Sequence, residues 1–234
     1  MISKTAMLSL VKGLRWKEAR DGFAEKPDLL RIRDKRGRTW LHLACAVDVS
    51  KRQAAARDSI RLAQVLLDRG SDINDAAFTE ENFKATPLWY AIAFGKNIPL
   101  AKVLLSRGSD PNYCMFAAAY NDDAAAIRLL ADNGAEIDPE AEGSTPFFAA
   151  VQWSRFKAAE ELLKQGANPN YQNSAGMTAL HCMLKKGIDK KYFRMLLSYR
   201  PRTDIPDRNG LTAASIMIKK RDPAFRQMAA VTPA

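Results

Sequence analysis

The side chains able to perform acid–base chemistry are few and recur at fixed positions in this sequence. The histidines His42 and His181 each stand three residues after a threonine. The acidic residues Asp72, Asp110 and Glu136 each follow a glycine by two positions. Recurrence at one turn position is typical of backbone capping, because such carboxylates accept from nearby N–H groups. The carboxylates are therefore predicted to have structural roles. The histidine slot holds Trp89, Phe116 and Phe148 in other copies, which favours a packing role for the histidines as well.

The sulfur chemistry of the chain is equally sparse. Cys45, Cys114 and Cys182 show no CxxC spacing, and an odd number of cysteines argues against a disulfide framework. No Walker loop, dinucleotide fingerprint or HExxH motif occurs. We expect no enzymatic activity, no cofactor and no metal site. The cysteines favour a reducing intracellular location such as the cytoplasm, while the nucleus or export without a cleaved signal stays open.

Two phrases alternate along the chain. The first joins an apolar pair to a glycine, a small residue and a run of Asp, Asn or Glu, and it occurs at 65–74, 104–112, 129–138 and 162–170, with a degenerate copy at 196–205. The second opens a helix with a threonine, often followed by proline, and begins at Thr39, Thr86, Thr145, Thr178 and Thr212.

The residue types in these phrases predict a helix–turn–helix unit. Threonine accepts from first-turn N–H groups, and proline fits the first helical position because its missing N–H is not needed there. Glycine suits the left-handed residue that ends the second helix. One helix pair cannot bury its apolar face alone, so the units are expected to stack.

Together the phrases resemble the ankyrin-repeat family, whose period is about 33 residues and whose core reads T-P-L-H. The resemblance implies an all-α solenoid of stacked helix–turn–helix repeats, about six units long. We expect a helical N-terminal cap at 1–36, the solenoid at 37–221 and a frayed C-terminal tail at 222–234. The first unit is long, since 47 residues separate Thr39 from Thr86, and part of the excess forms an insertion at 47–58.

Charge is distributed unevenly. Residues 1–40 carry 11 Lys/Arg against 5 Asp/Glu, and residues 185–234 carry 12 against 4, whereas the middle is mildly acidic. Solvated helix ends explain this pattern without a ligand. A second interpretation is an electrostatic surface for an acidic partner.

The resemblance also implies a concave binding surface built from the finger-like turns and the first helix of each unit. It implies protein–protein interaction, with nucleic acid or an anionic surface at the basic ends as the alternative. The aromatic members could instead pack on their own units, and the partner and oligomeric state stay open. The expected binding residues are Lys35, Arg36, Arg38, Phe94, Tyr120, Trp153, Lys185, Lys186, Arg208 and Lys219.

Overall fold

The computed structural model describes residues 2–50, 53–80 and 83–231. The chain divides into two compact units, Met1–Ala117 and Ala118–Ala234. Regular structure in the described residues is almost entirely helical, which confirms the all-α prediction. No helix among them combines the length and hydropathy needed to span a bilayer.

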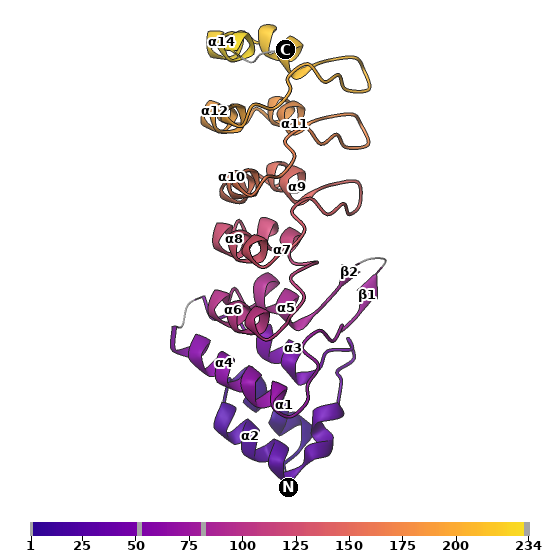
Figure 1. The fold of residues 1–234 in the computed structure, drawn as a ribbon, viewed down its shortest axis with the longest axis vertical. Coiled ribbons are helices and arrows are strands. Elements are labelled where there is room, and N and C mark those ends of the chain that lie inside the picture. Colours follow the sequence, from indigo (N-terminus) through magenta and orange to yellow (C-terminus); the bar gives the residue numbers. More distant parts are fainter. Residues whose placement is uncertain (1, 51–52, 81–82, 232–234) are drawn as a thin grey trace. The chain divides into compact units, whose positions relative to one another are not determined.

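The first unit contains helix pairs and one short β-hairpin. The inner helix α3 packs on its outer partner α4 and on the next inner helix, α5, while α4 packs on α6. Figure 1 shows the hairpin β1–β2 projecting beyond α5, away from α6. The elements are α1 (Lys4–Lys12), α2 (Trp16–Glu25), the 3-10 helix η1 (Pro27–Arg31), α3 (Trp40–Cys45), α4 (Gln53–Leu67), β1 (Thr79–Glu80), β2 (Phe83–Lys84), α5 (Pro87–Ala93) and α6 (Ile98–Ser106).

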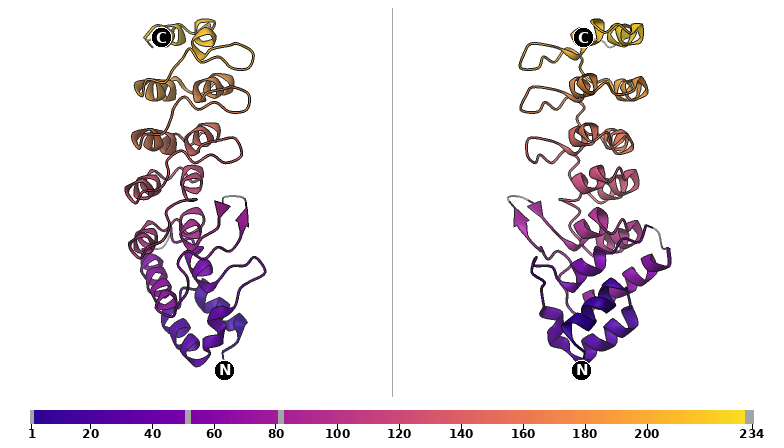
Figure 2. Two further views of the ribbon diagram at one scale, coloured as in Figure 1. Left: turned by 45° about the vertical axis from the view of Figure 1, so that its right-hand side comes forward. Right: turned by 180° about the vertical axis from the view of Figure 1, so that it is seen from behind.

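The second unit repeats one arrangement. The inner helices α9, α11 and α13 stack on one another, and the outer helices α8, α10 and α12 form a parallel row (Figure 2). Finger-like turns precede each of these inner helices on the side away from the outer row. The elements are α7 (Met115–Tyr120), which crosses the division between the units, α8 (Ala124–Asp132), α9 (Pro146–Gln152), α10 (Phe156–Lys164), α11 (Ala179–Lys186), α12 (Lys190–Ser198), α13 (Ala213–Ile218) and α14 (Pro223–Val231).

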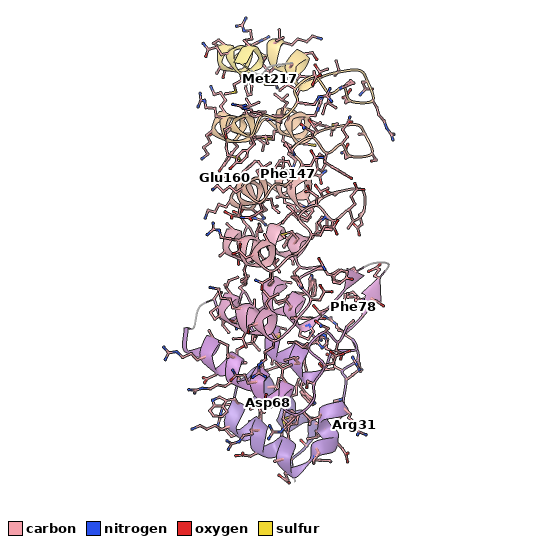
Figure 3. The ribbon with its side chains drawn as sticks, in the orientation of Figure 1. Arg31, Asp68, Phe78, Phe147, Glu160 and Met217 are labelled. Atoms are coloured by element: carbon pink, nitrogen blue, oxygen red, sulfur yellow. The ribbon has the colours of Figure 1, made fainter. Side chains whose placement is uncertain are left out.

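Inner helices begin at the predicted threonines. Thr86 Oγ1 accepts from the Trp89 N–H at 3.3 Å, and Thr145 Oγ1 accepts from the Phe148 N–H at 3.3 Å, with proline next in both cases. The apolar flanks of the helices face one another, and Phe147, labelled in Figure 3, is almost fully buried. Capping and stacking therefore follow from the same short phrase.

Two regions are more ordered or longer than the sequence indicated. The C-terminal segment predicted to fray is helical over Pro223–Val231, because Phe225 packs edge-on against Phe193 at 5.1 Å. Part of the 47–58 insertion lengthens α4 to 15 residues, whereas α6 has 9, and residues 51–52 of the insertion lie outside the described part. The boundaries at 36/37 and 221/222 stay predictions.

The turn after most outer helices uses a left-handed glycine. Gly108, Gly134 and Gly166 have φ of 89°, 81° and 91°. Arg200 occupies the same place after α12 and also has a positive φ, 52°. A side chain in this conformation brings its Cβ too close to the backbone carbonyl, which costs about 1–2 kcal/mol.

We expect Arg200→Gly to raise the free energy of unfolding by about 1 kcal/mol, since glycine adopts positive φ without that strain. Urea unfolding followed by circular dichroism measures the change. Arg194→Gly, at an exposed position in the interior of α12, is the control and should destabilise. A neutral or negative effect of Arg200→Gly would show that this turn carries no strain.

Asparagine side chains tie neighbouring fingers together. In the first unit, Asn74 Nδ2 donates to the Gly108 carbonyl at 3.1 Å, and Asn74 Oδ1 accepts from the Asp110 N–H at 2.8 Å. In the second unit, Asn170 Oδ1 accepts from the Arg202 N–H at 2.7 Å. The amide suits this position because it offers a donor and an acceptor at once.

Asp138 stands where three other copies of the repeat place asparagine, at 74, 112 and 170. Its Oδ2 accepts from the Asn168 N–H at 2.7 Å, but its Oδ1 is buried and has no hydrogen-bond partner. Burial raises the pKa of this carboxyl, the Asn168 N–H opposes the rise, and the Glu136 charge adds to it. An ionised Asp138 therefore lowers stability at neutral pH.

Asp138→Asn is expected to raise the free energy of unfolding by about 1 kcal/mol at pH 7, because the new amide can donate where Oδ1 has no partner. The pKa of Asp138 is higher in the folded chain than in the unfolded chain, so its penalty fades as pH falls toward about 4. The advantage of the variant should shrink over the same range in urea unfolding. Asn170→Asp is the matched control and should have the opposite sign.

Candidate functional site

Both histidines have structural roles, as predicted. His42 Nδ1 accepts from the Thr39 N–H at 3.1 Å, and Nε2 lies 2.9 Å from the Asp75 carbonyl oxygen. His181 repeats this arrangement, with Nε2 lying 3.0 Å from the Leu211 carbonyl oxygen. Each ring joins a helix start to the backbone of the next finger, so its nitrogens are occupied by structural bonds.

The cysteines are buried and unpaired with one another. Burial raises the pKa of the Cys45 and Cys114 thiols, and also that of Cys182, which disfavours the reactive thiolate. Within the described ranges, no group of three or more His, Cys, Asp or Glu side chains is arranged to hold a metal ion. The candidate site is therefore sought among the exposed aromatic and cationic side chains of the described residues.

In the first unit, aromatic rings meet at the foot of the hairpin. Phe83 contacts Trp89 at 5.3 Å and Tyr113 at 6.4 Å between ring centroids, and Phe78 at 5.7 Å. Trp89 in turn contacts Phe94 at 5.4 Å. These five residues are termed the hairpin aromatic cluster. Figure 3 labels Phe78 on the finger side of the unit.

Of this cluster, only Phe94 was predicted as a binding residue. One side of the Phe94 ring packs on Trp89 and Tyr90, as the packing interpretation expects. The side chain is still 52% exposed, so the rest of its surface is open to a partner. The cluster was missed because the sequence did not predict the pairing of β1 with β2, which brings the rings of Phe78 and Phe83 together. The sequence feature that could have indicated this hairpin is the extra length of the finger before Thr86.

The predicted cations of the first finger differ from one another. Lys35 and Arg36 are exposed. Arg38 is held by Asp34, with an N–O distance of 2.7 Å, and its guanidinium lies 6.0 Å from the Tyr90 ring centroid. Burial tends to raise the pKa of the Asp34 carboxyl. The ion pair with Arg38 and the finger N–H groups that bond to Asp34 together outweigh burial, so the pKa is lowered. Arg38 therefore braces its own finger.

In the second unit, the structure brings Tyr120 and Trp153 together. Their ring centroids are 5.3 Å apart in an edge-to-face arrangement, and the side chains are 56% and 41% exposed. Trp153 follows α9 directly, so both rings come from the ends of inner helices. The Arg155 guanidinium lies 5.6 Å from the Tyr120 ring centroid. These three residues are termed the Tyr120–Trp153 patch.

Arg155 was missed by sequence reasoning, which weighed only the last residues of each inner helix. It follows Ser154, whose φ is 58°, and it precedes α10 as the N-cap residue without a side-chain capping bond. The α10 N-terminus is instead capped from the neighbouring repeat, where Asp122 Oδ1 accepts from the Ala158 N–H at 2.8 Å. The Arg155 guanidinium therefore takes no part in capping α10.

The lysines at the ends of the inner helices divide into two kinds. Lys186 Nζ donates to the Gln152 carbonyl at the end of α9, and Lys220 Nζ donates to the Leu184 carbonyl at 3.5 Å. These contacts satisfy carbonyls at the C-terminal ends of inner helices, where a cation also suits the helix dipole. Lys185 and Lys219 are exposed, and no carboxylate among the described residues forms an ion pair with either.

Arg208 lies at a finger tip. Its side chain is exposed, while its backbone N–H donates to the Ala175 carbonyl of the preceding finger at 3.1 Å. The side chain therefore remains available as a cation, separate from the inner-helix ends that carry Lys185 and Lys219.

Comparison with known sequences supports the repeat assignment. A family model described as ankyrin repeats, in three copies, matches residues 88–173. Human inversin is 34% identical over 109 residues, which cover 46% of this chain and 10% of inversin. The human transient receptor potential cation channel subfamily A member 1 is 30% identical over 104 residues, covering 43% of this chain and 9% of the channel. The matched region is therefore a small part of each relative.

Solved structures extend the likeness of fold along most of the chain. The ankyrin-repeat domain of human ASB11 matches with a TM-score of 0.73 and 17% identity, covering 97% of both chains. That of Bcl-3, a member of the IκB protein family, gives 0.72 and 18%, covering 96% and 97%. An ankyrin-repeat domain from Acinetobacter baumannii gives 0.65 and 21%, covering 86% and 100%. With its threonine-capped inner helices and left-handed turns, the chain has the ankyrin-repeat fold, and its residues 88–173 match the ankyrin-repeat family.

Proposed function

We propose that this protein is a non-catalytic binding module that holds a partly apolar, acidic segment of another protein against the inner-helix ends of its second unit. Ankyrin-repeat domains generally bind proteins, and stacked repeats provide extended surfaces for this purpose. The observation that carries the proposal is the exposed, preassembled pair Tyr120 and Trp153 beside the Arg155 guanidinium.

The residue types of the patch suit protein recognition. Tyrosine, tryptophan and arginine dominate the energetics of protein interfaces. Tyrosine and tryptophan do so because they combine a large contact area with few rotamers to fix. Tyr120 and Trp153 hold each other edge-to-face before any partner arrives, which reduces the ordering cost of binding. Aromatic side chains left open to water in this way favour an interface over a purely structural role.

The charge of the second unit indicates the sign of the partner. Lys185 and Lys219 extend the inner-helix ends and have no described carboxylate in an ion pair. Exposed cations contribute chiefly by steering an acidic partner toward the surface. Lys35, Arg36 and the exposed Phe94 offer contacts of similar chemistry within the first unit.

The test compares wild type with Tyr120→Ala/Trp153→Ala. Each protein is used to capture partners from a lysate of the source cells, and the captured protein is purified and titrated calorimetrically. We expect the double variant to bind at least about tenfold more weakly, since truncating central aromatic residues commonly costs more than 1 kcal/mol each. Binding at full strength by the double variant would place the interface elsewhere.

Two controls make the result specific. Leu211→Ala removes a comparably exposed apolar side chain, 40% exposed, from a finger and should leave affinity unchanged. Phe94→Ala reports separately on the first unit. Unchanged far-ultraviolet circular dichroism shows that each variant is folded.

The alternative ligand class is nucleic acid, suggested by the net charge of +10. Phosphate binding would weaken steeply with salt, because each neutralised phosphate releases counterions. We expect no gel shift of a random-sequence duplex or single strand at low salt. A shift that disappears on replacing Lys185 and Lys219 by glutamine would favour nucleic acid over an acidic protein.

A further inference from the structure

The Arg155 guanidinium is a cation with a buried, unsatisfied donor in the described part of the second unit. Its Nε is buried and donates to no hydrogen-bond acceptor among the described residues, and no described carboxylate forms an ion pair with its terminal nitrogens. A buried donor without an acceptor is costly, so native structures rarely retain one without a reason. Arginine has no means of escaping the cost by losing its proton.

The surroundings of Arg155 fix its position without neutralising it. The Tyr120 ring lies under the guanidinium, with 5.6 Å between the Cζ atom and the ring centroid, and Trp153 meets that ring edge-on. An aromatic face attracts the cation but leaves its N–H groups unbonded. The nearby carboxylate of Asp122 already accepts from the Ala158 N–H, which holds that acidic group at the start of α10.

We propose that Arg155 receives a partner carboxylate, from an aspartate or glutamate that lies next to an apolar residue packed on Tyr120 and Trp153. This inference rests on the proposed function and specifies its recognition element. The planar guanidinium matches a carboxylate through two parallel N–H donors, a geometry that lysine does not offer. The exposed cations Lys185, at the end of the next inner helix, and Lys219, one repeat further, favour an acidic segment over a neutral one by charge complementarity.

The arrangement explains why the cation and the rings occur together. A partly desolvated guanidinium strengthens each charge-assisted bond that it forms. The apolar neighbour of the carboxylate would cover the exposed ring surface and exclude water from the pair. Arg155 is therefore the residue that selects an acidic side chain, and the two rings select its apolar neighbour.

The experiment pans a displayed library of random dodecapeptides on the full chain and on Arg155→Gln. Wild type is expected to enrich peptides with Asp or Glu within two residues of an aromatic or aliphatic residue. Arg155→Gln should keep the apolar preference and lose the acidic one. Lys157→Gln is the matched control, because it removes one exposed positive charge only two residues away, in the first turn of α10.

A double-mutant cycle then measures the pair directly. The best peptide and its Glu→Gln counterpart are titrated against wild type, Arg155→Gln and Arg155→Lys. The Glu→Gln change should cost about tenfold on wild type and less than about twofold on Arg155→Gln, with Arg155→Lys in between, as expected for coupled groups. Arg155 makes no side-chain hydrogen bond in the described structure, so these variants are expected to fold.

The outcomes separate the two proposals. An acidic preference retained by Arg155→Gln, or equal costs on both proteins in the cycle, overturns the carboxylate site but leaves the aromatic surface intact. Peptides that bind Tyr120→Ala/Trp153→Ala as tightly as wild type overturn the proposed function itself. Failure of wild type to enrich any peptide above an uncoated surface also overturns it, and the carboxylate site falls with it.

Discussion

His42→Ala is expected to lower the free energy of unfolding of the first unit by about 3 kcal/mol. The ring is fully buried, and Nε2 lies within 2.9 Å of the Asp75 and 3.2 Å of the Ala85 carbonyl oxygen. Nε2 therefore carries the proton, and Nδ1 accepts from the Thr39 N–H at 3.1 Å. Alanine leaves these groups without partners at about 1 kcal/mol each and opens a cavity beneath Tyr90.

The same histidine makes the first unit sensitive to acid. Burial lowers the pKa of His42, the Arg33 charge adds to this effect, and Asp75 opposes it. A base whose pKa is lower in the folded chain stabilises that state fully above the unfolded value of about 6.5. As pH falls through 6.5, the unfolded chain binds protons first, so stability declines. The difference between wild type and His42→Ala should therefore narrow between pH 7 and pH 5.

Hydrogen exchange read by mass spectrometry locates the effect. His42→Ala should lower protection in peptides from α3 and α5, because the lost bonds join α3 to the finger that precedes α5. His181→Ala is the matched control, since it removes the equivalent ring and should lower protection in α11 and α13 instead. Equal loss in both units from either variant would contradict the local role argued for each histidine.

The repeat phrase predicted the parts of the fold that depend on local chemistry. Thr86 and Thr145 begin helices because their hydroxyl groups accept from N–H groups three residues later, a relation contained within the phrase. The left-handed turns follow from glycine in the same way. The extra helix at the C-terminus could not be predicted, because it depends on the contact of Phe225 with Phe193, 32 positions away in the sequence.

Residues of the candidate surface were likewise predictable only where their position in the repeat determines their role. Register alone singled out Tyr120 and Trp153, because both end inner helices, and the structure places them in contact. Register did not distinguish Lys185 from Lys186, although the second donates to the Gln152 carbonyl of the preceding repeat. Arg155 was missed because its lack of an acceptor is a property of its three-dimensional surroundings and leaves no mark on the sequence.

Gly37→Ala should destabilise the first unit by about 3 kcal/mol through two separable effects. The φ of Gly37 is 74°, and a side chain in this conformation costs about 1–2 kcal/mol. A Cβ at Gly37 would also overlap the carbonyl oxygen of Ala77 in the next finger, and relief of such overlap by backbone movement costs about 1–3 kcal/mol. Gly37 therefore allows two fingers to approach closely at the point where the hairpin begins.

Gly210→Ala separates the two effects, because Gly210 occupies the same repeat position with the same φ of 74° and its Cβ would meet nothing within 4 Å. This control should cost only the conformational part, about 1 kcal/mol. Exchange protection gives the free energy of local opening in each variant, read for α3 and α5 in Gly37→Ala and for α13 in Gly210→Ala. The excess for Gly37→Ala measures the close packing of neighbouring fingers. Equal losses would mean that this packing contributes nothing and that the conformational requirement for glycine alone explains both positions.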